Sequence, residues 1–173
     1  MKLLMHMCCA PCSVYPVEVL QKKGIELEGF FYNPNIHPLE EYSKRRDNVE
    51  RFSLKKGLRI HYSNDFKQEV WEGYSGLEIE RCTMCYDMRL EKAASFAAEN
   101  GFNAFTTSLL VSPYQKHELI RELGEKYAVR YGVEFHYIDF RSGFRQGQQQ
   151  AKEMGLYRQK YCGCIVSLNG VSK

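Results

Sequence analysis

The 173-residue sequence lacks the features that mark several common classes of protein. No apolar run approaches the length of a membrane span, and there is no internal repeat or low-complexity tract. No flavin or nicotinamide fingerprint is present. The first seven residues make a poor signal peptide, because their apolar run is short and contains His6. These absences predict a protein with no membrane association that resides in the cytoplasm, where thiols stay reduced.

Composition and charge place few limits on function. Hydrophobic residues make up 44% and charged residues 26% of the chain, which is ordinary for a globular protein. The length predicts one domain, residues 1–173, with room for a sizeable core. The net charge of +3 is too small to indicate nucleic-acid binding by itself. Residues 139–161 carry five basic and two acidic side chains, a pattern typical of a solvated face but also suited to phosphate contacts.

The cysteines are arranged in an unusual way along the sequence. Seven cysteines form three compact groups separated by 69 and 76 residues: Cys8-Cys9-x-x-Cys12, Cys82-x-x-Cys85 and Cys162-x-Cys164. Structural zinc sites and iron–sulfur clusters both use such short spacings. Each group is too small to complete a four-ligand site, so the pattern predicts that the groups meet in space.

Disulfide bonds and isolated core thiols fit this arrangement less well than metal ligands do. A disulfide framework needs an oxidising compartment and usually an even number of cysteines, whereas this chain has seven. Isolated core thiols are common, but doublets and C-x-x-C pairs are not typical of core filling. The spacing therefore favours metal or redox chemistry.

Apolar, β-rich runs alternate with helical patterns along the chain. Strands are expected at residues 2–7, 27–32, 58–62, 104–108 and 133–138. The helices between them are expected to begin with Pro16 in a first turn, at His37-Pro38, near Cys82, and at a capping box formed by residues 112–115. This alternation predicts an α/β fold with a doubly wound, mostly parallel five-stranded sheet of Rossmann-like type and a cysteine-containing C-terminal tail.

The expected fold gives the first cysteine group a defined place. Cys8, Cys9 and Cys12 lie in the turn between the first strand and the first helix, at the sheet edge where ligands bind in such folds. Nucleotide-binding proteins have glycines in this turn, but here there are none. Thiols thus replace the phosphate loop, and a helix amino terminus favours the thiolate form. Cys82 and Cys85 are expected on one helix face, and the tail can fold back to close the site.

Several segments together resemble the cobalamin-independent epoxyqueuosine reductases of the tRNA queuosine pathway. They are residues 8–13, 31–38, 80–86, 106–115 and 157–164, so the resemblance runs nearly end to end. It implies a fold related to the ATP pyrophosphatase (PP-loop) proteins. The Ser-Gly-Gly phosphate loop of that wider group is missing, which argues against ATP binding.

The resemblance also implies a reaction, cofactors and partners. The enzyme would remove the epoxide oxygen of epoxyqueuosine in the tRNA anticodon loop, using a 4Fe-4S cluster beside a separate metal ion, expected to be iron. Its metal ligands would come from Cys8, Cys9, Cys12, Cys82, Cys85, Cys162 and Cys164, with their division left open. Because no redox-cofactor fingerprint is present, electrons would come from an external low-potential donor such as a ferredoxin or flavodoxin.

A few residues outside the cysteine groups are hypothesised to take part in the reaction. His6 is a candidate proton donor, although a lone histidine in an apolar run is more often structural. Asn33, Arg81 and Arg158 are candidate substrate contacts. Three tyrosines could stack on bases, although most tyrosines serve packing: Tyr114, Tyr157 and Tyr161. The alternative functions are an iron–sulfur tRNA thiolase and a zinc-stabilised RNA-binding module.

Overall fold

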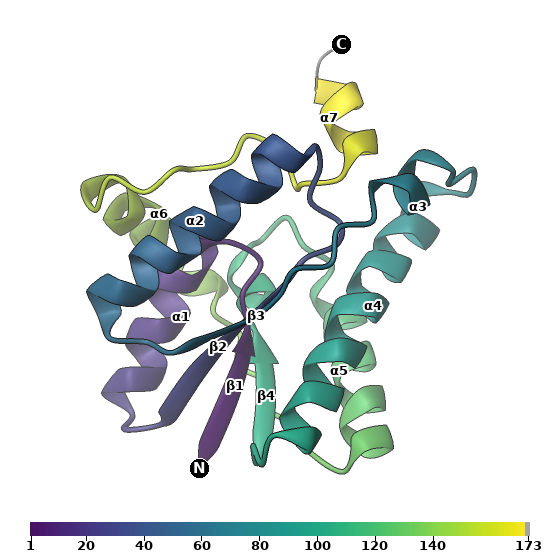
Figure 1. The fold of residues 1–173 in the computed structure, drawn as a ribbon. Coiled ribbons are helices and arrows are strands. Elements are labelled where there is room, and N and C mark those ends of the chain that lie inside the picture. Colours follow the sequence, from purple (N-terminus) through teal and green to yellow (C-terminus); the bar gives the residue numbers. More distant parts are fainter. Residues whose placement is uncertain (172–173) are drawn as a thin grey trace.

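The computed structural model describes residues 1–171, and its centre is a five-stranded sheet in which every strand pair is parallel (Figure 1). The strands are β1 (Lys2–His6), β2 (Glu26–Tyr32), β3 (Ile60–Ser63), β4 (Ala104–Thr107) and β5 (Glu134–Phe135). Their order in the sheet is β3-β2-β1-β4-β5. The doubly wound parallel fold expected from the alternating pattern is thereby confirmed.

Helices cover both faces of the sheet (Figure 1). Helices α1 (Ala10–Lys22), α2 (Leu39–Lys56) and α6 (Phe144–Glu153) lie on one side, and α4 (Glu78–Glu99) and α5 (His117–Tyr131) lie on the other. Short elements complete the fold: α3 (Gln68–Glu72), α7 (Ile165–Val171) and the 3-10 turns η1 (Ser108–Val111) and η2 (Arg141–Gly143). Because both faces are covered, consecutive residues at the centre of strand β1 are apolar, and Leu3, Leu4 and Met5 are all fully buried.

The strand order reverses between β1 and β4, and this reversal locates the crevice of the fold. The chain leaves β1 toward α1 on one face and leaves β4 toward α5 on the other. Such a point, at the carboxyl ends of the strands, is where α/β sheets bind ligands. The two exits are joined by a hydrogen bond from the Cys8 amide to Ser108 Oγ, 3.0 Å long. The first cysteine group therefore sits at the switch point of the sheet.

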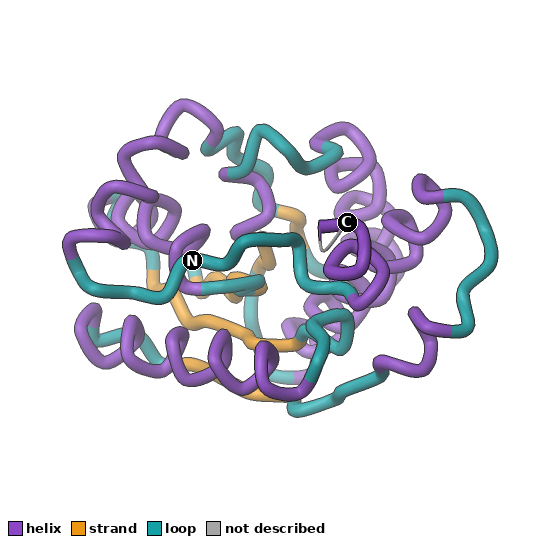
Figure 2. Tube along the Cα trace, turned by 90° about the horizontal axis from the view of Figure 1, so that it is seen from above, coloured by secondary structure: helices purple, strands orange, loops and turns teal. Residues whose placement is uncertain are grey.

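The C-terminal segment passes over this crevice. After α6 the chain crosses above the carboxyl ends of the strands and reaches α7, which packs near α3 on the far side (Figure 1). The view from above shows the same crossing between the two helical layers (Figure 2). The cysteine-containing tail expected from the sequence thus lies over the site it was expected to close.

Several element boundaries differ from those expected. Pro16 lies inside α1, and Pro11 occupies the first turn, because the helix begins directly after the cysteine doublet. Helix α4 begins at Glu78, one turn before Cys82. Residues 112–115 form no helix start; Ser112 Oγ accepts a hydrogen bond from the Tyr114 amide in a turn, and α5 begins at His117. Strand β5 has only two residues.

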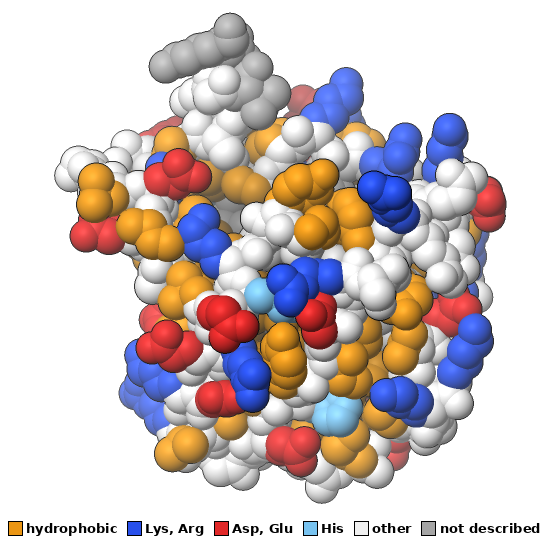
Figure 3. Space-filling view, turned by 180° about the vertical axis from the view of Figure 1, so that it is seen from behind, with side chains coloured by type: hydrophobic (Ala, Val, Ile, Leu, Met, Phe, Trp, Pro, Cys, Tyr) orange, Lys and Arg blue, Asp and Glu red, His pale blue; other side chains and the backbone are white. Residues whose placement is uncertain are grey.

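The surface carries both charge signs. On the face opposite to the view of Figure 1, basic and acidic side chains alternate, and hydrophobic side chains are exposed toward the carboxyl end of the sheet (Figure 3). Among the described residues, none of the helices has the length and apolar character of a membrane span. The basic segment includes Arg141, which is paired with Asp139 at 2.7 Å and is thus partly neutralised.

Candidate metal centre

The three cysteine groups meet in one cavity of about 400 Å³ at the carboxyl edge of the sheet. Six of the seven cysteines are among its lining residues: Cys8, Cys9, Cys12, Cys82, Cys85 and Cys162. The seventh, Cys164, is buried beside Ser167, two residues beyond Cys162. The convergence predicted from the small size of each group is therefore present in the structure.

The loop after β1 brings three thiols closest together. The sulfurs of Cys8, Cys9 and Cys12 all lie within 4.8 Å of one another, and those of Cys8 and Cys9 are 3.8 Å apart. Two sulfurs bound tetrahedrally to one ion at about 2.3 Å would be separated by about 3.8 Å. This loop therefore has the spacing for a single metal ion. Ser108 Oγ lies 3.2 Å from Cys8 Sγ, and Gln159 Nε2 donates to Cys9 Sγ at 2.7 Å.

Proton sharing within each group favours one thiolate. Hydrogen bonds from Cys12 and Cys9 hold the pKa of Cys8 well below its usual value. Burial raises the pKa of Cys9 to about 12, and donation to Cys8 raises the pKa of Cys12. In the tail, a hydrogen bond from Cys164 lowers the pKa of Cys162 to about 5. Metal binding requires deprotonated sulfur, so these shifts favour the required form of one sulfur in each group.

A buried arginine lies beside the second cysteine pair. Cys82 and Cys85 occupy the second turn of α4, and Arg89 follows one turn later. Arg89 Nε donates to the Cys85 carbonyl at 3.0 Å, and its Nη2 lies 3.4 Å from Cys85 Sγ. Burial opposes the charge of Arg89, but the sulfurs of Cys85 and Cys8 outweigh it and raise the pKa of the guanidinium. Burial raises the pKa of the Cys85 thiol, and the charge of Arg89 opposes this rise because a fixed cation stabilises negatively charged sulfur.

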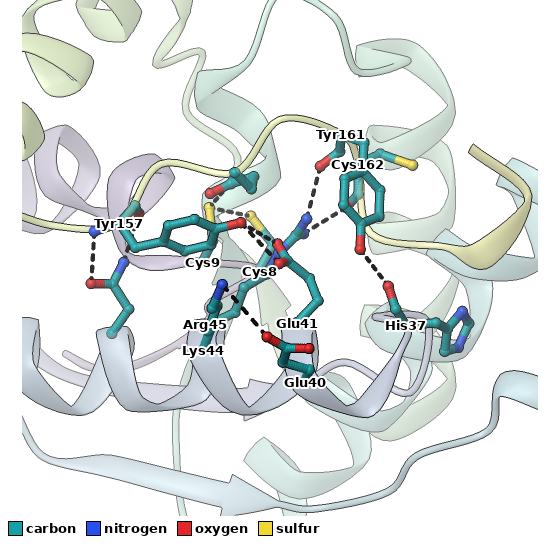
Figure 4. A network of polar contacts seen from close by, with 12 residues as sticks. Cys8, Cys9, His37, Glu40, Glu41, Lys44, Arg45, Tyr157, Tyr161 and Cys162 are labelled. Carbon is teal, nitrogen blue, oxygen red and sulfur yellow. Dashed lines mark hydrogen bonds and ion pairs between the residues drawn. The ribbon is translucent and has the colours of Figure 1, made fainter. Parts of the chain in front are cut away.

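A second buried arginine holds the tail in place (Figure 4). Arg45 of α2 is 2% exposed and donates to two tail carbonyls, those of Cys162 at 2.9 Å and Tyr161 at 2.8 Å. Its Nε donates to Glu41 at 2.9 Å, and Glu41 also accepts from the Tyr157 hydroxyl. The guanidinium therefore fixes the backbone that presents Cys162.

Gly163 allows the tail to approach this closely. Its φ of +136° is a conformation that side-chain-bearing residues rarely adopt, and a Cβ would lie 3.0 Å from Arg45 and 3.2 Å from Ile36. The His37 amide donates to the Gly163 carbonyl at 2.7 Å. Glycine between Cys162 and Cys164 thus lets the backbone turn against α2 and the segment before it.

The candidate proton donor His6 is not among the residues that line the cavity. It is fully buried, with Nδ1 3.0 Å from Thr107 Oγ1 and Nε2 3.1 Å from Asn33 Oδ1. Burial, with a smaller effect of Arg89, lowers the pKa of His6 to about 4, so the ring is neutral at pH 7. These surroundings are those of a structural residue and do not favour the expected role.

Substituting His6 tests this interpretation. His6→Gln is expected to lower the free energy of unfolding by about 2 kcal/mol, because buried partners such as Thr107 lose hydrogen bonds. Turnover by the remaining folded protein should change little. Urea unfolding and assays of the same preparation give both quantities. A loss of about 100-fold or more in a folded variant, the size expected for a general acid, would restore the proton-donor role.

The candidate substrate contacts also lie away from the cavity lining. The amide of Asn33 is buried and donates to the Met7 carbonyl at 2.9 Å. Arg158 is exposed on the tail, and Arg81 precedes Cys82 with a buried Nε that has no hydrogen-bond partner within residues 1–171. Instead, Asn35 lines the cavity, with its Oδ1 buried and without a hydrogen-bond partner among the described residues.

Four site residues could not be selected from the sequence: Arg45, Arg89, Asn35 and Gln159. Arg45 and Gln159 act through contacts between segments far apart in the chain, such as α2 with the tail. The one signal in the sequence is that Asn35 lies in the segment 31–38 and Gln159 in the segment 157–164, both of which carry the family resemblance.

The parallel α/β fold and the thiol-lined cavity at its switch point define a candidate metalloprotein of the Rossmann-like class. Comparison with known proteins is more specific. The sequence model of the family described as "Epoxyqueuosine reductase QueH" matches residues 3–170. The chain therefore belongs to this family, as its motifs predicted.

Individual relatives match over nearly the full chain. The chain is 40% identical to the epoxyqueuosine reductase QueH of Acinetobacter baylyi, over 99% of this chain and 83% of that protein. It is 36% identical to the corresponding protein of Dehalococcoides mccartyi, over 96% of this chain and 92% of that one. The similarity to these reductases is therefore not confined to one segment or one cysteine group.

Similar solved structures support the fold. A teicoplanin deacetylase, Orf2, in its zinc-inhibited form is 9% identical and superposes with a TM-score of 0.53, covering 89% of this chain and 83% of that one. A predicted subunit of a tRNA methyltransferase from Methanocaldococcus jannaschii is 13% identical, also with a TM-score of 0.53, covering 87% and 75%. At such low identity these similarities show the fold alone. The expected relationship to ATP pyrophosphatases stays a prediction.

Proposed function

We propose that this chain reduces epoxyqueuosine to queuosine in the anticodon loop of tRNA. Membership of the epoxyqueuosine reductase family supports this activity, and the observation that carries the mechanism is the meeting of three cysteine groups in one cavity. The reaction converts an epoxide to an alkene and releases water, so it consumes two electrons and two protons. The electrons come from an external low-potential donor, and the cytoplasmic location stays a prediction.

The proposed cofactors are an iron–sulfur cluster and a separate iron ion. Seven thiols exceed the four that a cluster requires, and at least one thiol of the loop after β1 would hold the separate ion. The spacing of 3.8 Å between the sulfurs of Cys8 and Cys9 fits two ligands of one ion. When bound, these groups supply single electrons and Lewis acidity.

The remaining cavity residues suit a polar substrate. The unpartnered Oδ1 of Asn35 can accept a hydrogen bond from a substrate hydroxyl or amine, which would satisfy a buried polar atom. With His6 outside the cavity lining, the ionisable lining groups besides the thiols that can donate a proton include Tyr86, Tyr161 and Lys160. Burial raises the pKa of the Tyr86 hydroxyl, so it stays protonated at neutral pH.

Separate replacement of the loop thiols tests the two-metal assignment. At least one of Cys8→Ala, Cys9→Ala and Cys12→Ala is expected to keep the cluster absorption, lose about one iron per chain and lose turnover, because one thiolate of a single-ion site is missing. Iron, sulfide and product are measured together after anaerobic purification. Parallel loss of cluster and iron in all three variants would contradict the assignment.

The same preparation tests the alternative of a zinc-stabilised RNA-binding module. The spacing within the Cys8–Cys12 loop also fits one zinc ion. A brown protein that contains sulfide supports the reductase, whereas a colourless protein that contains only zinc and does not convert epoxyqueuosine when reduced would support the module. The thiolase alternative predicts ATP-dependent sulfur transfer instead.

A further inference from the structure

Tyr114 is a largely exposed aromatic residue beside the cysteine cavity. It is 83% exposed, yet it is among the residues that line the cysteine cavity. The other large hydrophobic side chains that are exposed in the described part of the chain include Leu54 and Val129, and none of them is aromatic. Exposure of an apolar ring to water is unfavourable, so a ring at the mouth of a cavity is typical of a ligand contact.

The two remaining tyrosines that could have stacked on bases are already engaged. The Tyr157 hydroxyl donates to Glu41, and the Tyr161 hydroxyl donates to the carbonyl of His37. Both tyrosines therefore help to dock the tail onto α2 and the segment before it. Of the three tyrosines, Tyr114 is the one whose side chain is largely exposed to solvent.

The ring of Tyr114 is held in a defined position. It meets Phe144, the first residue of α6, edge to face, with ring centroids 5.8 Å apart and planes at 81°. The backbone before it is fixed by the hydrogen bond from the Tyr114 amide to Ser112 Oγ, 3.2 Å long. The carboxyl end of the sheet exposes hydrophobic side chains on the face seen in Figure 3. A ring fixed in this way loses little conformational entropy when a flat ligand stacks on it.

The polar groups beside Tyr114 match a nucleobase. Gln115 and Gln148 line the same cavity. The Gln115 Oε1 accepts a hydrogen bond from the Tyr86 hydroxyl, so its amide group faces a base mainly as a donor, whereas the Gln148 amide has both a donor and an acceptor. Lys160, from the tail, also lines the cavity and can pair with a phosphate. An aromatic platform with amides and an exposed cation is typical of sites for unstacked bases of RNA.

We propose that Tyr114, supported by Phe144, stacks on the 7-deazaguanine base of the substrate nucleoside. This proposal rests on the proposed function. In epoxyqueuosine the epoxide-bearing ring is joined to the base through an aminomethyl arm. When that ring reaches the buried thiols of Cys9 and Cys12, the base lies nearer the mouth, where Tyr114 is exposed. The base must leave the stack of the anticodon loop to occupy this position.

Binding of RNA by the as-isolated protein tests the proposal without turnover. The probe is a fluorescent anticodon stem-loop containing epoxyqueuosine, with a second stem-loop containing guanine at that position. Tyr114→Ala is expected to raise the Kd about tenfold or more for both RNAs, because stacking does not read the epoxide. Tyr114→Phe and Tyr114→Trp should stay within about threefold of the unmodified protein, because both keep a π-face.

Val129→Ala is the matched control, since Val129 is 85% exposed on α5 and is not among the cavity-lining residues. It should leave the Kd unchanged, and the iron content of every variant should match that of the parent protein. An unchanged Kd in Tyr114→Ala would overturn the proposal. So would a Tyr114→Phe variant as weak as Tyr114→Ala, because that result assigns the contact to the hydroxyl. Failure of the parent protein to convert epoxyqueuosine when reduced would instead overturn the proposed function.

Discussion

Cys85→Ala is expected to abolish cluster binding and to lower epoxyqueuosine turnover by about 100-fold or more, while the protein stays folded. Cys85 projects from the second turn of α4 into the cavity, and its sulfur lies 3.4 Å from the Arg89 guanidinium. Loss of outer-shell partners alone commonly costs 10–100-fold, so loss of a ligand should cost at least as much. Alanine suits a helix, and Cys85 is not among the residues of the hydrophobic core, so folding is retained. Sulfide and iron analysis, electron paramagnetic resonance and circular dichroism give the three readouts.

Thr83→Ala is the control for this substitution. Thr83 lies between the two cysteines on the same helix, but its hydroxyl donates to the Ile79 carbonyl and it is not among the cavity-lining residues. Cluster content and turnover should match those of the parent protein. Full cluster occupancy in both Cys82→Ala and Cys85→Ala would contradict the ligand role of this pair. Retention in one variant alone would show that another thiolate or a water molecule can replace the missing ligand.

The sequence was sufficient to predict the fold and the meeting of the cysteines because both follow from short-range patterns. Buried parallel strands read as apolar runs, and the switch point of such a sheet fixes where the loop after β1 must lie. Once Cys8–Cys12 is placed there, a tail with a C-x-C pair can contribute to the same metal site only by crossing the carboxyl edge of the sheet. The sequence therefore predicts the place of six of the seven cysteines at the cavity without knowledge of any tertiary contact, and their role as metal ligands stays a prediction.

The differences between the expected and the observed surroundings of the site residues have a common cause in tertiary contacts. His6 and Asn33 end strands beside the cysteine loop, but they hydrogen-bond to each other below the cavity, whereas Asn35 reaches it. In a strand, alternate residues point to the same face of the sheet, so the sequence predicts their direction. Residues 33–38 do not form a strand, and the sequence therefore does not predict which of them face the cavity. The capping box expected at residues 112–115 fails because η1 follows β4 and Ser112 caps a turn.

The two buried arginines are the site residues that are hardest to predict from the sequence. Arg45 and Arg89 lie in helices rich in charged residues, where a basic side chain is expected to face water. Each is instead buried in the folded protein, and each donates to the cysteine groups or their backbone. Helical periodicity does place Arg45 on the buried stripe of α2, between Tyr42 and Val49. What the sequence does not show is that carbonyls of the distant tail accept its hydrogen bonds.

Arg45→Met is expected to release the tail and to lower the free energy of unfolding of the metal-free protein by about 3 kcal/mol. Methionine keeps the apolar bulk but loses the donors to the carbonyls of Tyr161 and Cys162, and it leaves Glu41 without its buried cation. Because the same bonds present Cys162 to the cavity, bound iron should fall as well. Urea unfolding, hydrogen exchange of residues 157–164 and iron analysis measure the three effects.

Two further variants distinguish the effect of the uncompensated Glu41 charge from the effect of releasing the tail. Arg46→Met is the control for loss of a guanidinium, because Arg46 contacts Asn64 and the Tyr62 ring rather than the tail. Glu41→Gln combined with Arg45→Met removes the uncompensated carboxylate and should restore part of the unfolding free energy, whereas fast exchange in the tail and low iron should persist. If the tail keeps its protection in Arg45→Met, the bonds to Tyr161 and Cys162 do not hold it, and the presentation of Cys162 must depend on His37 and Gly163 instead.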